Sequence, residues 1–289
     1  MGWAGFEFAI EELPLVFFTA LTPMGIVCMV VLLALILTKR FSRKESIALN
    51  QLAWIPLAVT TVGFIAAAAH LGTPANALFV VMGVGRSPLS NEVLLAVIFL
   101  GACGANWLYS FVRTDKVGLK RVAAVLIIGI GVAALLSIAF AYDVDTIQSW
   151  HTAYVPINLV LGGLTGGLLL TQLVIILGTD ADEHQRLKKL LPLTAVVFLL
   201  LHLLSIGLQW MQLGGMNGAY GTAADFVPLY PLMACLYAVL GLGGSLLAAN
   251  VQRFKRQKLA SVAAVVLITC GYVIVRFGFY MMHMTSGLA

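Results

Sequence analysis

Eight long apolar segments, separated by short connections, constrain most strongly how this chain folds. They cover approximately residues 13–38, 50–71, 90–111, 119–142, 153–178, 189–212, 228–250 and 259–282. A helix needs about 20 mostly apolar residues to cross the hydrocarbon core of a membrane, and each segment reaches this length. The sequence therefore predicts an all-α integral membrane protein, a single transmembrane domain over residues 1–289 built as an eight-helix bundle.

The composition supports this class, because 61% of the residues are hydrophobic and only 10% are charged. The residues before the first segment include Glu7, Glu11 and Glu12 but no Lys or Arg. A cleaved signal peptide begins with a basic region, so the first segment is predicted to remain as a membrane helix.

The basic residues alternate strictly from one connection to the next. Fifteen of the 17 Lys and Arg residues follow the odd-numbered segments: Lys39, Arg40, Arg43, Lys44, Arg113, Lys116, Lys120, Arg121, Arg186, Lys188, Lys189, Arg253, Lys255, Arg256 and Lys258. Cytoplasmic connections of membrane proteins carry such an excess, so these four connections are predicted to be cytoplasmic. Both termini are then extracytoplasmic. The net charge of +5 reflects this topology, and no nucleic-acid partner is expected.

Small residues at helical spacing predict close helix packing in the fifth and seventh segments. Gly162, Gly163, Gly166 and Gly167 lie in the fifth, and Gly241 and Ser245 in the seventh. Such residues let helix backbones approach closely, either within one bundle, which is favoured here, or at a homodimer seam.

The stretch from His70 to Glu92 concentrates titratable groups at one membrane face. His70 ends the second segment, Glu92 begins the third, and Arg86 lies between them. Each alone is compatible with a helix-dipole or capping role. Together they place an imidazole, a guanidinium and a carboxylate at one depth, which predicts a reactive site at the extracytoplasmic face.

The eighth segment adds three polar side chains on one helix face, Arg276, Tyr280 and His283. A cation within the hydrocarbon region is costly unless it is paired, and such residues are functional candidates. Arg276 is predicted to pair with Glu92 or with an oxygen atom of a bound ligand. A purely structural ion pair is the alternative.

These side chains suit the oxidation of a hydroquinone, which releases two electrons and two protons. Histidine and a partly buried carboxylate can accept protons near neutral pH, so His70 and Glu92 are the predicted catalytic acceptors. Arg86, Arg276, Tyr280 and His283 are predicted to bind or orient the quinol head group.

Neither a haem nor a metal site is expected. Of the five histidines, only His70 and His283 could form an axial haem pair, and both are near the membrane surface. His202, alone within the sixth segment, is predicted to be a hydrogen-bonded core histidine. The cysteines, predicted to be buried small apolar residues, lie singly in apolar segments: Cys28, Cys103, Cys235 and Cys270.

Several motifs resemble the membrane-anchor subunit of the bacterial dimethyl sulfoxide reductase family: HLGTPANAL, GRSPLSNEV, YDVDTIQSW and RFGFYMMHMTSG. The resemblance implies a haem-free anchor in the bacterial cytoplasmic membrane. It also implies two partners on the outer face, a molybdopterin catalytic subunit and an iron–sulfur subunit with four cubane-type clusters. Menaquinol would be oxidised beside that face, and the family's quinol-site histidine and glutamate match His70 and Glu92.

Two other functions remain open at this point. A small-solute permease would carry polar residues or broken helices near the membrane midplane, whereas the polar groups here gather at one face. An anchor without a redox role would use His70, Glu92 and Arg276 only to cap helices and to pair charges.

Overall fold

The structure, a computed structural model, describes residues 2–38, 41–70, 79–80, 82–112, 117–180, 182–218 and 221–283. This part of the chain is almost entirely helical, and it contains eight helices that are long and apolar enough to cross a membrane. The predicted number of spans is therefore confirmed.

The spans agree with the predicted segments to within about four residues, with one exception. They are α2 (Leu13–Leu37), α3 with α4 (Arg43–Leu52 and Trp54–Ala69), α5 (Pro88–Tyr109), α6 (Val117–Ala141), α7 (Tyr154–Gly178), α8 (Gln185–Leu213), α9 (Tyr230–Ala249) and α10 (Gln257–Met281). The exception is the second span, which begins at residue 43 instead of residue 50. The first residues of α3 are polar but helical, and they precede the apolar part of the span.

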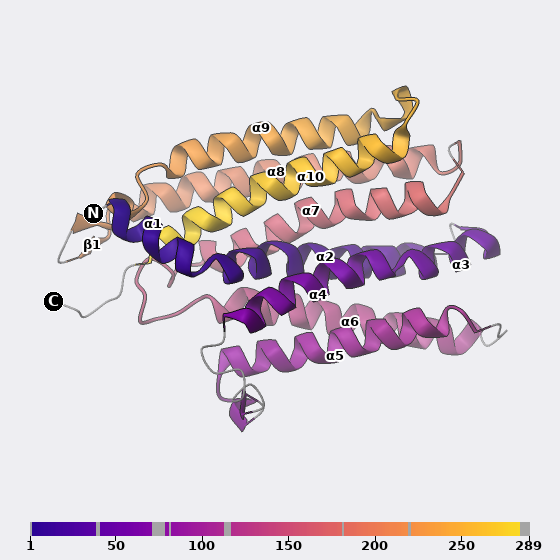
Figure 1. The fold of residues 1–289 in the computed structure, drawn as a ribbon, viewed down its shortest axis with the longest axis horizontal. Coiled ribbons are helices and arrows are strands. Elements are labelled where there is room, and N and C mark those ends of the chain that lie inside the picture. The colour runs from indigo at the N-terminus through magenta and orange to yellow at the C-terminus, as the bar shows by residue number, and fades with distance from the viewer. Residues whose placement is uncertain are drawn as a thin grey trace.

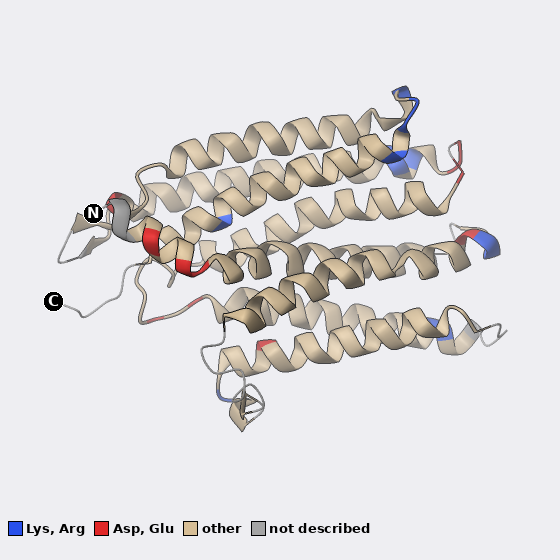
Figure 2. Cartoon of the chain, viewed as in Figure 1, with Lys and Arg blue, Asp and Glu red and all other residues tan. Residues whose placement is uncertain are grey.

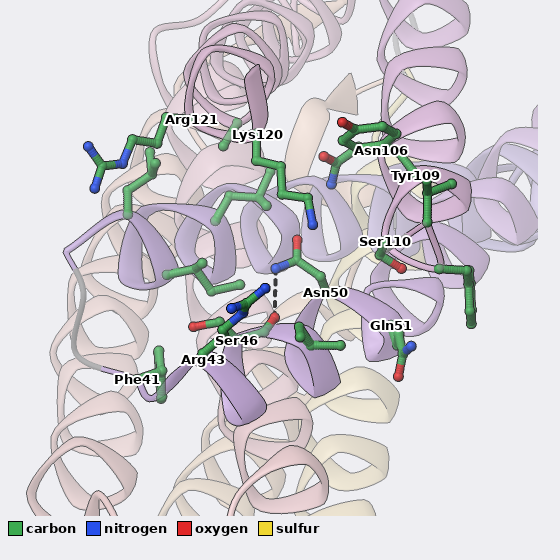
Figure 3. A pocket seen from close by; sticks show the side chains of 17 residues that line it. Phe41, Arg43, Ser46, Asn50, Gln51, Asn106, Tyr109, Ser110, Lys120 and Arg121 are labelled. Carbon is green, nitrogen blue, oxygen red and sulfur yellow. Dashed lines mark hydrogen bonds between the residues drawn. The ribbon is translucent and has the colours of Figure 1, made fainter. Parts of the chain in front are cut away.

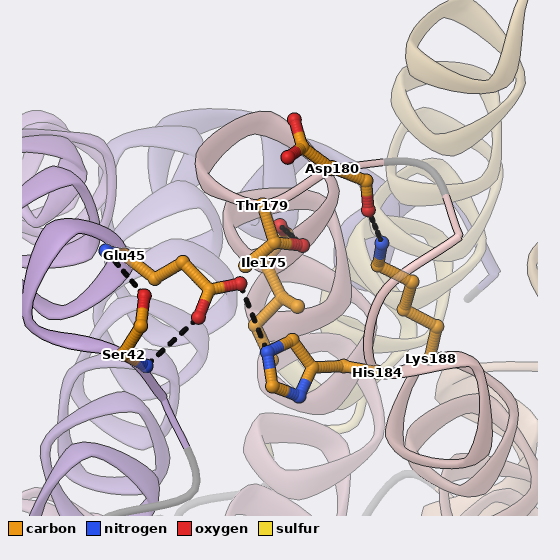
Figure 4. Close-up of polar contacts among 7 residues, drawn as sticks. All are labelled: Ser42, Glu45, Ile175, Thr179, Asp180, His184 and Lys188. Carbon is orange, nitrogen blue, oxygen red and sulfur yellow. Dashed lines mark hydrogen bonds and ion pairs between the residues drawn. The ribbon is translucent and has the colours of Figure 1, made fainter.

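A capping box starts this early helix α3. The hydroxyl of Ser42 accepts a hydrogen bond from the backbone N–H of Glu45 at 3.2 Å, and the Glu45 carboxylate accepts one from the backbone N–H of Ser42 at 2.8 Å (Figure 4). The break between α3 and α4 lies one turn before Pro56, whose missing N–H cannot bond to the carbonyl of Leu52.

Helices α2 and α7 form the centre of the bundle. Helix α2 packs against α4, α6, α7 and α10, and Figure 1 shows α8, α9 and α10 on one side of this centre and α5 and α6 on the other. Glycines permit the α2–α7 contact, because a Cβ at Gly163, Gly166 or Gly167 would collide with Pro23, Met24 or Val27 of α2. The predicted packing within one bundle is confirmed for these glycines.

The two ends of the bundle differ in the charged residues that they carry (Figure 2). The basic residues of the predicted cytoplasmic connections lie at one end, apart from Lys39, Arg40, Arg113 and Lys116, which fall outside the described residues. The first and last described residues lie together at the other end (Figure 1), where a Cβ at Gly5 would collide with the carbonyl oxygens of Phe226 and Met281. We refer to these as the basic end and the terminal end.

The terminal end carries structure that hydropathy did not predict. Helix α1 (Gly2–Glu11) packs against α10 and the 3₁₀ helix η2 (Ala223–Phe226), and the two-residue strands β1 (Asn217–Gly218) and β2 (Gly221–Thr222) form a small antiparallel hairpin. Helix α1 has ten residues, whereas a helix needs about 20 to cross a membrane, so α1 is too short to be a span.

The prediction for the cysteines is wrong in part. Cys28 and Cys103 are buried, but Cys235 on α9 and Cys270 on α10 are exposed. The outer surface of a membrane bundle faces lipid, so an apolar residue in a span need not point inward.

Candidate functional site

Arg276 lies buried at the terminal half of α10, with 2% of its surface exposed. Its Nε donates a hydrogen bond to the hydroxyl of Thr19 on α2 at 2.9 Å. The guanidinium carbon lies 4.2 Å from the ring centre of Phe279, 5.6 Å from that of Tyr280 and 5.8 Å from that of Tyr142. These are cation–π distances, so aromatic rings and one hydroxyl form most of the cation's environment.

The predicted ion pair between Arg276 and Glu92 is wrong, since none joins these two described residues. The packing order explains the absence. Glu92 is on α5, which packs against α6 and α4, whereas α10 packs against α9, α7 and α2.

One guanidinium nitrogen of Arg276 remains available. Nη2 is buried and has no hydrogen-bond partner among the described residues. Buried polar groups are almost always hydrogen-bonded, so an unpaired charged donor needs an explanation. A ligand oxygen, the other predicted partner of Arg276, would satisfy it.

Aromatic side chains enclose this end of α10. The indole of Trp150 stacks on Phe279, with ring centres 4.7 Å apart, and makes edge contacts to Tyr280 at 5.6 Å and to His283 at 5.2 Å. Tyr280 is fully buried and donates its hydroxyl to the carbonyl of Leu15 at 3.3 Å. The predicted alignment of Tyr280 and His283 on one side of α10 is therefore confirmed by their shared contact with Trp150.

His283 lies just beyond the C-terminal end of α10 and belongs to the same aromatic cluster. Its imidazole stacks on Phe8 of α1 with ring centres 4.2 Å apart, and the residue is partly buried. Burial lowers the pKa of His283, because an apolar environment disfavours the imidazolium. This imidazole is consequently neutral near neutral pH.

Glu92 is buried on the first turns of α5, with 3% of its surface exposed. Its carboxylate has no hydrogen bond or ion pair with any described residue. Tyr142, just beyond the end of α6, is close enough to both Glu92 and Arg276 to be influenced by the charge of each. Burial raises the pKa of Tyr142 well above its usual range, Tyr280 and Glu92 raise it further, and Arg276 opposes them.

His70 caps the end of α4, and its side chain is 38% exposed. Its Nε2 lies 3.2 Å from the Oε2 atom of Glu12, in the connection between α1 and α2. Burial raises the pKa of Glu12, the proximity of His70 lowers it, and Glu11 raises it. The imidazole and the carboxyl group therefore lie within ion-pair distance at the terminal end, although Oε2 of Glu12 has no hydrogen-bond partner among the described residues.

The predicted role of Arg86 toward the quinol head group stays a prediction. Arg86 lies exposed in the turn before α5, and it forms no ion pair with His70, Glu92 or any other described residue. Residues 71–78 and 81 of the same stretch, which include most of the HLGTPANAL motif, fall outside the described residues.

The other histidines have local partners. The Nδ1 atom of His202 is 3.0 Å from the hydroxyl of Tyr237, which confirms the predicted hydrogen-bonded core histidine. His151 contacts Asp143 at 2.9 Å, and His184 contacts Glu45 at 3.0 Å (Figure 4). Within the described ranges, no three His, Cys, Asp or Glu side chains are grouped so that they could hold a metal ion.

Sequence reasoning missed several residues of this site, namely Glu12, Thr19, Tyr142, Trp150 and Phe8. Tyr142 and Trp150 belong to the YDVDTIQSW motif, whose two aromatic residues in an acidic loop could have marked them. No sequence signal singles out Thr19, because a threonine within an apolar span commonly bonds to its own helix, as Thr171 does.

Comparison with known proteins gives a consistent result over nearly the whole sequence. A family model described as the DMSO reductase anchor subunit (DmsC) matches residues 7–282. The protein is 29% identical to the C subunit of anaerobic dimethyl sulfoxide reductase of Haemophilus influenzae over 277 residues, 96% of each of the two sequences. It is 28% identical to the C subunit of the Escherichia coli enzyme, over 90% of this sequence and 91% of that one. It is 27% identical to the YnfH chain of an anaerobic dimethyl sulfoxide reductase of Escherichia coli, over 79% of this sequence and 80% of that one.

Proposed function

Because the chain belongs to the family of DMSO reductase anchor subunits, as its motifs predicted, we propose that it oxidises menaquinol for a membrane-bound molybdopterin oxidoreductase. It holds a catalytic subunit and a four-cluster iron–sulfur subunit at the bacterial cytoplasmic membrane and passes the electrons to the iron–sulfur subunit. The basic end faces the cytoplasm, so the terminal end, which carries the candidate site, faces outward.

The observation that carries the proposal is the buried carboxylate of Glu92 at this end of the bundle, which has no hydrogen-bond or ion-pair partner among the described residues. Keeping such a group charged and unpaired is costly, so buried carboxylates without partners are concentrated where protons are exchanged. A purely structural glutamate would be expected to have a hydrogen-bond donor or a cation beside it.

Each residue of the site has its own role in quinol oxidation. Oxidation of the quinol to the quinone releases two electrons, which leave to the iron–sulfur subunit, and two protons, one from each hydroxyl. Glu92 accepts one proton. His70 accepts the other and, because its side chain is 38% exposed, releases that proton at the terminal end. The Nη2 atom of Arg276 donates a hydrogen bond to one of the two hydroxyl oxygens of the quinol. Tyr280 and Trp150 exclude water from the head group.

The test compares quinol-driven and dye-driven turnover of the purified complex, where a reduced dye delivers electrons directly to the partner subunits. Glu92→Gln and His70→Ala should each lower quinol-driven turnover by about 100-fold or more, because general-base catalysis contributes that much. Dye-driven turnover and subunit composition should not change.

Glu11→Gln is the matched control, since Glu11 is an exposed carboxylate at the same end of the bundle. It should leave both activities unchanged. Loss of the partner subunits in Glu92→Gln or His70→Ala would mean that these residues act structurally, and undiminished quinol turnover would remove them from the site.

A further inference from the structure

A cavity of about 840 Å³, seen from close by in Figure 3, lies at the basic end of the bundle. Glu92 and Arg276 lie toward the opposite ends of their helices. It is enclosed by the C-terminal ends of α2 and α5, by α3 and by the first turns of α6. None of its lining residues takes part in the candidate quinol site, so the proposed function does not account for it.

Cations and amides form one side of this cavity. Figure 3 shows the amine of Lys120 and the guanidinium of Arg43 directed toward Asn50. Arg121 also belongs to the lining, but its guanidinium points away from these two cations. None of the described lining residues carries a carboxylate. Two inward-facing cations in such a lining favour an anionic ligand.

The other side of the cavity is apolar. Leu33, Ile36 and Leu37 line it from α2, and Ala124 lines it from α6. At its edge, Phe111 and Val112 are more than half exposed. A small hydrated anion gains nothing from this apolar wall, whereas a ligand with hydrocarbon tails does.

We propose that this cavity binds an anionic phospholipid, with its phosphate between Arg43 and Lys120 and its acyl tails along Leu33, Ile36 and Ala124. Basic pockets between transmembrane helices on the cytoplasmic side are suited to such head groups. A bound lipid would join the α5–α6 pair to α2 and α3. Free inorganic phosphate shares the anionic chemistry but would leave the apolar wall without a partner.

Native mass spectrometry of the intact complex, delipidated and then titrated with phosphatidylglycerol, tests the proposal. Wild type should retain one phosphatidylglycerol molecule per anchor subunit. Lys120→Gln should weaken binding about fivefold and Arg43→Gln with Lys120→Gln about 25-fold, since each basic residue near an anionic lipid contributes about 1 kcal/mol.

Arg121→Gln is the matched control, because it removes the same charge from the adjacent residue of α6 but from a side chain that points away from Arg43 and Lys120. It should bind phosphatidylglycerol as wild type does. Equal weakening in Lys120→Gln and Arg121→Gln, or no weakening in either, would overturn the site. If the double variant fails to assemble, the comparison of Lys120→Gln with Arg121→Gln tests the lipid site on its own.

Two further ligands distinguish the source of the anion. Phosphatidylcholine, which has the same acyl tails but no net charge, should bind more weakly than phosphatidylglycerol. Inorganic phosphate at equal concentration should not displace phosphatidylglycerol. Displacement by inorganic phosphate would show a free-anion site and overturn the lipid assignment, and equal binding of the two lipids would show that the cations do not select the ligand.

Discussion

The guanidinium of Arg276 and the hydroxyl of Thr19 form a buried hydrogen bond of 2.9 Å between α10 and α2, across 257 positions of sequence. It is the polar link that holds the cation of the candidate site in place. The remaining close neighbours of the guanidinium are aromatic rings, which attract it but fix its orientation less strictly.

Thr19→Val should therefore destabilise the protein and impair quinol oxidation. The substitution conserves shape but leaves a second donor of Arg276 unpaired in the interior, which costs about 1–3 kcal/mol. We expect a lower thermal midpoint in detergent and reduced quinol-driven turnover of the complex.

Thr171→Val provides the comparison. Thr171 is equally buried and donates its hydroxyl to Gly167 of its own helix at 2.8 Å, as Thr19 does to Leu15 at 2.8 Å, but of the two threonines only Thr19 accepts a hydrogen bond from Arg276. It should affect stability less and leave quinol turnover unchanged. If the two variants behave alike, the bond from Arg276 to Thr19 has no special role.

Arg276→Lys should weaken quinol binding while preserving the charge. Lysine lacks the planar fork that allows one nitrogen to bond to Thr19 while another faces a ligand. Loss of one charge-assisted hydrogen bond to the quinol, worth about 1.5 kcal/mol, should raise the KM for quinol about tenfold. Steady-state kinetics with a soluble quinol analogue measures this.

Arg86→Lys is the corresponding control. Arg86 is exposed and forms no ion pair with a described residue, so the KM of this variant should not change. A raised KM in Arg86→Lys would support the prediction that Arg86 binds the quinol head group, and an unchanged KM in Arg276→Lys would exclude Nη2 as a ligand donor.

The sequence predicted the fold better than the site, for a physical reason. Hydropathy depends on each segment alone, so the eight spans and the basic end could be derived without knowing how the helices pack. The neighbours of Arg276 depend on which helices touch. The predicted position of both residues near the same membrane face pointed to Glu92 as its partner, but α2 lies against α10 and supplies Thr19 instead. Helix α1 was missed for a related reason, because it is stabilised by its contacts with α10 and η2.

Stability at mildly acidic pH should depend on His283. Burial holds its pKa below the ordinary value of 6.5, so in acid the unfolded protein binds a proton that the folded protein resists. The folded state therefore loses stability as the pH falls from about 6.5 toward the lowered pKa. Glu12, whose pKa is raised, contributes in the opposite direction between its ordinary 4.5 and its raised value.

His283→Phe separates the two contributions. Phenylalanine retains the stack on Phe8 but cannot titrate. The thermal midpoint of wild type should fall more steeply between pH 7 and pH 5 than that of His283→Phe. Parallel curves for the two proteins would show that protonation of His283 does not oppose folding.

Quinol oxidation through this subunit should generate little or no membrane potential. Glu92 and the pair formed by His70 and Glu12 all lie at the terminal end, and the proposed iron–sulfur partner binds at that same end. Protons and electrons then leave on one side, so no net charge crosses the membrane. Proteoliposomes containing the complex, with a voltage-sensitive dye and an added quinol, measure this directly. A potassium gradient with valinomycin verifies that the dye responds. A potential that develops with quinol and collapses with an uncoupler would mean that protons from Glu92 or His70 are released at the basic end instead.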